Sequence, residues 1–204
     1  MRPMLAVPVL AGLALSVAHA ARSTSLEEFQ GQIAERAGDP KAAVKLWFDA
    51  VYVYIGGNQE LGEQLITEMS RYKDWKATQG YFTNALDNKP HILRSYANGA
   101  TPENKYTMDP EKAHVWRSYV KGTSPENGHE VTDIEAIEVQ TRFQSGEEPT
   151  ADSRNIRMFC HSTGADNDRP LKFERDSRGQ WRITEFSSMC LGVRPPKDPK
   201  AVDF

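Results

Sequence analysis

The sequence predicts an α+β fold in which N-terminal helices pack on one face of a curved antiparallel sheet. The first half of the chain contains a stretch, residues 39–55, whose apolar side chains cover most of a helical circumference. In the second half, segments between residues 137 and 186 alternate apolar and polar side chains, which is typical of strands covered on one side. Because the two patterns occupy separate parts of the chain, we expect segregated layers of helix and sheet.

Residues 1–20 have the pattern of a secretory signal peptide. Arg2 gives a positive start, residues 5–17 are apolar, and Ala18-His19-Ala20 is a small-residue cleavage site. The apolar run is too short to span a bilayer comfortably, so we expect a periplasmic or secreted protein with no membrane insertion after cleavage. Arg2 is the only charge removed with the signal, and the net charge changes from −3 to −4, which argues against nucleic acid as a partner.

Capping residues mark the helical part of the chain. Residues 21–38 are expected to form an N-terminal arm or a short helix that begins after Ser25. The apolar helix begins after Asp39, a good N-cap, and further helices are predicted for residues 58–71 and 90–96. We expect the apolar helix to turn its broad stripe to the core and a polar ridge to solvent. That ridge consists of Lys41, Lys45, Asp49 and Tyr52.

The second half is predicted to form strands joined by turns. Ser177-Arg178-Gly179 suits a three-residue hairpin loop with Gly179 in the left-handed conformation. One domain is expected over residues 39–193, and residues 194–204 are expected to be a disordered tail. The predicted strands are residues 115–121, 137–143, 156–162, 171–175 and 181–186.

Two segments carry a resemblance to a known superfamily. They are the helix that begins at Asp39-Pro40 and contains Trp47, and the closing hairpin with Arg169-Pro170-Leu171-Lys172-Phe173 and Arg178-Gly179-Gln180-Trp181-Arg182-Ile183. This pattern resembles the cone-shaped nuclear transport factor 2-like superfamily, and within it an uncharacterised bacterial domain family. The resemblance implies a curved sheet wrapped around a long helix, with a pocket at the open end. The superfamily contains isomerases, dehydratases and non-catalytic binding proteins, so the fold alone does not define an activity.

The hairpin loop sets a register that places a carboxylate on the core side of the sheet. Burial of an unpaired carboxylate is costly, so Glu185 should find a partner, titrate upward or line a cavity. We therefore predict a ligand pocket with Glu185 at its floor and Arg175, Trp181 and Thr141 nearby. Alternatively, Glu185 lies beyond the cover of the helix and faces solvent. The predicted cross-strand pairs are Arg175 with Trp181, Phe173 with Ile183, and Leu171 with Glu185.

The two cysteines, Cys160 and Cys190, would meet an oxidising compartment together. A disulfide between them would close a loop of about 30 residues and contribute roughly 3–4 kcal/mol in the chain-entropy model. The strand of Cys160 would lie two strand spacings, about 10 Å, from the strand of Glu185, and Cys190 lies beyond that last strand. A bridge therefore requires the chain after the last strand to curl back. Two separate buried thiols are the alternative.

One polar loop invites a metal-binding interpretation. His161, Asp166 and Asp168 surround the turn between two predicted strands. A calcium site requires six or more oxygen ligands in a defined loop pattern, and a polar turn explains the same residues. We therefore predict no metal site and no cofactor.

The predicted function is that of an exported, non-catalytic binding or interaction domain. Its partner would be a small ligand in the pocket or a protein on the outer face of the sheet. Two alternatives stay open. One is a small-molecule enzyme of isomerase or dehydratase type that uses Glu185, and the other is an immunity or adaptor protein of a secreted toxin system.

Overall fold

The computed structural model describes residues 22–73, 114–133, 137–190 and 193–197, without the side chains of residues 187 and 190. The predicted signal peptide, the helix predicted for residues 90–96 and residues 198–204 lie outside this set. Among the described residues, no helix is long and apolar enough to cross a membrane.

Three helices open the described chain, and the first two begin at the predicted caps, Ser25 and Asp39. Ser25 Oγ accepts a hydrogen bond from the backbone N–H of the first turn of α1 (Leu26–Arg36). Asp39 caps α2 (Pro40–Ile55) in the same way, with its Oδ1 2.7 Å from the amide nitrogen of Ala42. Asn58 caps α3 (Gln59–Met69). These caps satisfy amides that have no partner inside a helix, so the starting points follow from local chemistry.

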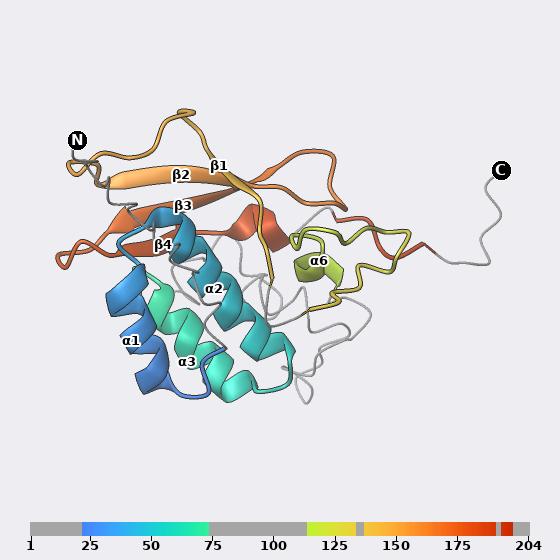
Figure 1. Cartoon of the computed structure of the whole chain (residues 1–204), viewed down its shortest axis with the longest axis horizontal. Coiled ribbons are helices and arrows are strands. Elements are labelled where there is room, and N and C mark those ends of the chain that lie inside the picture. Colours follow the sequence, from blue (N-terminus) through green and yellow to red (C-terminus); the bar gives the residue numbers. More distant parts are fainter. Residues whose placement is uncertain (1–21, 74–113, 134–136, 191–192, 198–204) are drawn as a thin grey trace, which may run out of the picture.

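A four-stranded antiparallel meander follows, and its strands lie in chain order. The strands are β1 (Thr141–Phe143), β2 (Asn155–Cys160), β3 (Arg169–Arg175) and β4 (Trp181–Glu185). The hairpin turn between β3 and β4 has Gly179 at φ 81°, as predicted. Figure 1 shows α1, α2 and α3 together on one side of this sheet. The predicted α+β arrangement with helices on one face is therefore confirmed, and the sheet is not closed into a barrel.

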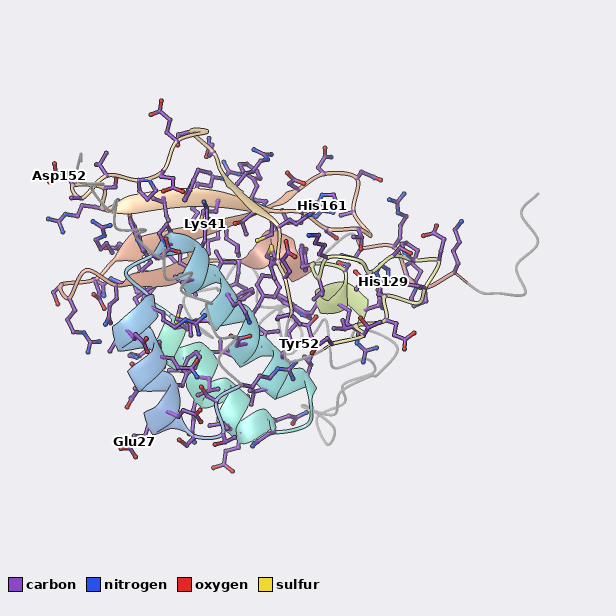
Figure 2. All side chains as sticks on the ribbon, viewed as in Figure 1. Glu27, Lys41, Tyr52, His129, Asp152 and His161 are labelled. Carbon is purple, nitrogen blue, oxygen red and sulfur yellow. The ribbon has the colours of Figure 1, made fainter. Side chains whose placement is uncertain are left out.

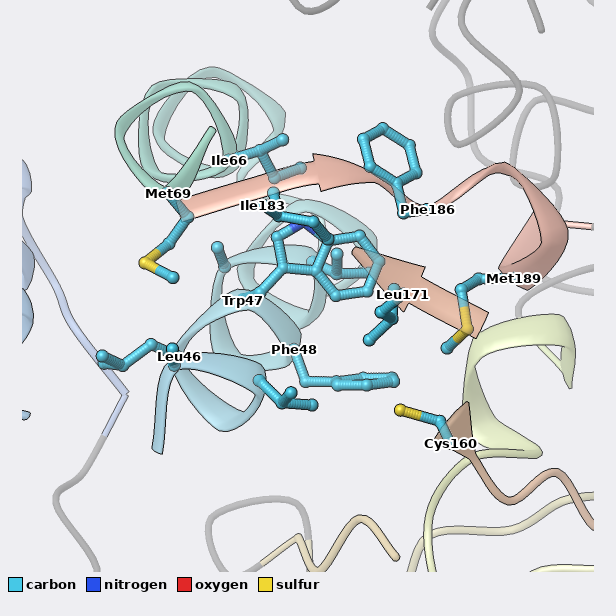
Figure 3. Close-up of a cluster of buried hydrophobic side chains, with 14 of the residues drawn as sticks. Leu46, Trp47, Phe48, Ile66, Met69, Cys160, Leu171, Ile183, Phe186 and Met189 are labelled. Carbon is cyan, nitrogen blue, oxygen red and sulfur yellow. The ribbon is translucent and has the colours of Figure 1, made fainter. Parts of the chain in front are cut away.

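The core lies between α2 and the inner face of the sheet. Trp47 is fully buried at its centre, and Figure 3 shows its indole between the helices and the strands that carry Leu171 and Ile183. The ring centroids of Trp116 and Phe186 lie 5.0 and 5.3 Å from that of Trp47. Aromatic side chains bury large areas, so this cluster accounts for much of the free energy that holds the two layers together.

The polar ridge predicted for α2 is wrong in two of its four positions. Asp49 and Tyr52 are both buried. Lys45 holds Asp49 in an ion pair at 2.9 Å, and burial outweighs this pair and raises the pKa of the Asp49 carboxyl above its usual value. The Tyr52 hydroxyl donates a hydrogen bond to the backbone oxygen of Trp116, 3.3 Å away. The apolar stripe in the sequence of α2 shows only which side faces the sheet. It does not show that other segments, such as the one that contains Trp116, bury the opposite side as well.

The strand predicted for residues 115–121 is also wrong. Residues His114–Arg117 form a short helix, α6, and the amide of Ser118 continues the turn by donating to the carbonyl of His114. Only Val120 of this segment makes a β-bridge, to Val139. Buried side chains occur at consecutive positions here, and seven residues are too few to distinguish the helical period from that of a strand.

The beginning of the predicted disordered tail is held against two loops. The amide of Arg194 donates to the carbonyl of Gly164 at 2.7 Å, and the amide of Lys197 donates to that of Pro125 at 2.9 Å. The buried His129 donates from Nε2 to the carbonyl of Arg194 at 3.0 Å. Figure 2 shows His129 beside α6, where this segment passes. Residues 194–197 thus make hydrogen bonds to two loops, and disorder of the tail stays a prediction.

Candidate functional site

The predicted pocket residue Glu185 points away from the core. A β-bulge between Lys172 and Phe173 shifts the register, so Glu185 lies opposite Lys172 and not opposite Leu171 as predicted. Its carboxylate forms an ion pair with the Lys172 ammonium group, which is half exposed. The other two predicted pairs, Arg175 with Trp181 and Phe173 with Ile183, are confirmed. Glu185 thus finds its partner on the outer face of the sheet.

The structure brings two of the four predicted pocket residues together. The guanidinium carbon of Arg175 lies 4.5 Å from the ring centroid of Trp181, which is fully buried. Thr141 lies on β1, at the opposite side of the sheet from β4, and pairs with Cys160. The four residues therefore lie on both faces of the sheet, and Thr141 lies on the edge strand farthest from β4. A pocket that they share stays a sequence-based prediction.

A cluster of basic and aromatic side chains occupies the outer face instead. Phe159 on β2 lies opposite Arg142 on β1, and the guanidinium carbon of Arg142 is 4.4 Å from its ring centroid. Arg157, two residues earlier on β2, places its guanidinium carbon 5.2 Å from the same centroid. Lys172 on β3 lies opposite Arg157. We call Arg142, Arg157, Phe159 and Lys172 the outer-face platform.

The charges of the outer-face platform are unequally compensated. Arg142 donates from Nε to Asp168 Oδ2 at 2.8 Å, and His161 contacts the other oxygen of Asp168 at 3.1 Å. Burial alone would raise the pKa of Asp168, but the hydrogen bonds from Arg142 and His161 lower it below its usual value. Among the described residues, no acidic partner is found for the exposed Arg157. The platform therefore presents, within the described part of the chain, at least one uncompensated cation beside an aromatic ring.

A cavity of about 550 Å³ adjoins the outer-face platform. It lies under the loop of residues 144–154 that joins β1 to β2, and Arg157, Phe143 and Glu148 contribute to its lining. A second cavity of about 420 Å³ shares Phe143 and Glu148 with the first, and its lining includes Thr141 and Lys41. Lys41, at the start of α2 (Figure 2), pairs with Glu148, which lines both cavities, at 2.7 Å. Arg157 thus belongs to both the platform and the larger cavity.

The buried thiol of Cys160 has no feature of a reactive cysteine. Cys160 is free and fully buried, and burial raises the pKa of its thiol far above the usual value. In Figure 3 its sulfur lies among core side chains near Phe48. The side chain of Cys190 lies outside the described residues, so the disulfide stays a prediction.

The loop considered for metal binding uses its acidic groups for ion pairs. Asp168 is engaged by Arg142 and His161, and Asp166 lies 3.5 Å from Arg194. Over the ranges that the structure describes, no group of three or more His, Cys, Asp or Glu side chains is placed to hold a metal ion. The polar-turn interpretation accounts for these residues.

No sequence motif singles out Arg142, Arg157 or Phe159. The sequence does indicate part of the site, because the alternation in residues 137–143 places Arg142 on the solvent-exposed face of its strand. Phe159 is harder to identify, since the alternation in residues 156–162 is irregular and an aromatic side chain suggests a core position. The register of β1 against β2 is what brings the three side chains together.

Comparison with known proteins gives one result. A family model described as a domain of unknown function (DUF6935) matches residues 22–112 and residues 107–197, so the two matches together cover most of the chain. No curated protein gave a match, and no solved structure gave one either.

Proposed function

The chain belongs to the DUF6935 family, a domain of unknown function, and from the geometry of its sheet we propose that it is a non-catalytic binding domain that takes another protein on the outer face. The observation that carries this proposal is the stack of Arg142 and Arg157 on Phe159, on the face of the sheet opposite the helices. Arginine and aromatic residues are the types most enriched at the energetically dominant positions of protein interfaces.

The arrangement of the remaining groups favours binding over catalysis. The enzyme alternative requires Glu185 in a sheltered pocket, where burial could tune its pKa for proton transfer. Glu185 instead pairs with Lys172, a member of the outer-face platform. The interior around Trp47 is filled by aromatic side chains, and the cavities that adjoin the sheet lie under the loop of residues 144–154.

The proposal includes export of the chain and membership of the cone-shaped superfamily. The pattern of residues 1–20 supports a periplasmic or secreted location for the mature chain. The nuclear transport factor 2-like assignment is supported by a long helix packed on one face of an antiparallel meander, with its Trp in the core. That superfamily includes non-catalytic binding proteins, which is consistent with a binding role for this chain.

A site-specific crosslinking experiment tests the proposed function. A photoreactive amino acid replaces Asn155, which is exposed and shares the outer face with Arg157, or Glu27 on α1 as a control. Figure 2 shows Glu27 on the far side of the molecule from the sheet. Each variant is exposed to the secreted or periplasmic fraction of the source organism and irradiated. We expect one defined adduct from position 155, none from position 27, and its loss when Arg142 and Arg157 are both replaced by alanine.

Two outcomes would overturn the proposed function. Equal adducts from positions 155 and 27 would show that the outer face has no special role. A defined adduct that survives the double arginine replacement would show that the outer-face platform is not the contact.

A further inference from the structure

Two guanidinium groups on the sheet share a single aromatic ring and leave most of their donors unused. Arg142 commits its Nε to Asp168, and its side chain is still 57% exposed. Within the described ranges, no hydrogen-bond partner is found for its terminal nitrogens or for any side-chain nitrogen of Arg157. A guanidinium group has five N–H donors in a fixed planar fork. The platform thus offers several directed donors to a ligand.

Stacking prepares these donors for a planar anion. The guanidinium carbons of Arg142 and Arg157 both lie over the ring of Phe159, and each guanidinium carries its N–H donors in a fixed planar fork. Carboxylates accept two parallel hydrogen bonds from such a fork, and these charge-assisted bonds are stronger than neutral ones. Both guanidinium carbons lie within 5.2 Å of one ring centroid, so one acidic segment can reach both.

The small number of positive charges on the outer-face platform limits the kind of anion that it can bind. The chain as a whole is acidic, with a net charge of −3. The platform contains three cations, of which Lys172 pairs with Glu185 and Arg142 shares Asp168 with His161. Nucleic acids and anionic membranes are bound by more extended basic surfaces. A short protein segment with one or two carboxylates and an apolar neighbour matches two guanidinium groups and an aromatic ring.

We infer that the partner presents an acidic peptide segment, whose carboxylates bind Arg142 and Arg157 while a neighbouring side chain packs on Phe159. This inference rests on the proposed function and adds the chemical class of the partner. The cavity that Arg157 lines, under the loop of residues 144–154, provides room for a further side chain of the same segment.

Titration with defined peptides tests this inference by nuclear magnetic resonance. The probes are an end-blocked pentaglutamate, an end-blocked pentalysine, inorganic phosphate and a short single-stranded DNA. We expect pentaglutamate to shift the backbone amide signals of residues 142 and 157–159, with affinity that falls as salt is added. Replacement of Arg157 by alanine should weaken binding roughly tenfold, since hydrogen bonds to charged groups are worth about that factor.

Matched variants separate recognition from bulk charge. Arg178→Ala removes an equally charged side chain, 68% exposed, from the β3–β4 turn and should leave the affinity unchanged. Arg157→Lys keeps the charge but loses the planar fork, and it should weaken binding nearly as much as Arg157→Ala.

The inference is overturned if pentaglutamate gives no shifts at the platform, or if Arg178→Ala weakens its binding as much as Arg157→Ala. It is also overturned if pentalysine binds equally well, or if phosphate or DNA binds the same residues more tightly than pentaglutamate. In each of these cases a defined crosslink from position 155 would still support the proposed function, so the two failures are distinguishable.

Discussion

Replacement of Gly62 by alanine should destabilise the protein, although helix propensity alone predicts the opposite. Gly62 lies in α3, where the helix crosses the backbone of α2. A Cβ atom added to Gly62 would lie 2.4 Å from Cα and 2.5 Å from the backbone nitrogen of Tyr54. The obstructing atoms belong to a helix backbone, so they cannot move aside as a flexible side chain would.

The size of the effect follows from two opposing contributions. Alanine is about 1 kcal/mol more favourable than glycine in the interior of a helix. Carbon atoms in contact are normally about 3.5–4.0 Å apart, so α2 and α3 would have to separate by roughly 1 Å along much of their contact. Overpacking of this kind costs about 1–3 kcal/mol and occasionally more. We expect the clash to win and the free energy of unfolding to fall by about 1–2 kcal/mol.

Chemical unfolding followed by circular dichroism measures this difference, with Gly31→Ala as the matched control. Gly31 lies in α1 and is exposed, and a Cβ atom added to it would meet nothing within 4 Å beyond its own helix. Its replacement should therefore raise the free energy of unfolding by about 0.5–1 kcal/mol. A Gly62→Ala protein as stable as the wild type, or more stable, would refute the close packing of α2 on α3.

Three further predictions concern buried polar groups. The buried Arg182 donates hydrogen bonds to Asp176, to the carbonyl of Glu68 and to Gln180. Its replacement by methionine should therefore lower the free energy of unfolding, measured in urea, by about 3 kcal/mol. The exposed Arg178→Met, as a control, should change the urea midpoint little. Burial lowers the pKa of His129 below 6.5, so its contribution to stability is complete above pH 6.5 and is lost as the pH falls through the lower folded value. His129→Asn, which tolerates the φ of 53°, should reduce this acid-side loss of the urea midpoint, and an unchanged pH profile would contradict the assignment. In the reduced Cys190→Ser protein, Cys160, fully buried with a raised pKa, should react with a thiol reagent only at the rate of global unfolding, and fast labelling of the native variant would disprove its burial.

The elements fixed by local chemistry were predictable from the sequence. Asp39 and Ser25 mark helix starts because each side chain satisfies backbone amides within three residues of itself. Gly179 marks the hairpin because its positive φ is favourable for glycine. By contrast, the helical turn at Val115 and the hydrogen bond from Arg194 to Gly164 depend on contacts with distant segments, which no local pattern contains.

The sequence predicts that the sheet has an exposed outer face, but not which side chains come together on that face. The alternation of Arg142 with apolar neighbours indicates an open outer face. The bulge after Lys172 moves Glu185 to that face, and a two-residue period cannot reveal a bulge. The stack on Phe159 likewise requires the register of β1 against β2, which depends on a long loop and not on a short turn.

The dissociation constant of the partner crosslinked through position 155, measured at fixed salt, tests the role of the outer-face platform most directly. The two arginines share one ring, so their effects are not additive. The double replacement of Arg142 and Arg157 by alanine should weaken binding by at least roughly tenfold, while Arg178→Ala should leave it unchanged. A double variant that binds within about twofold of the wild type would contradict the account.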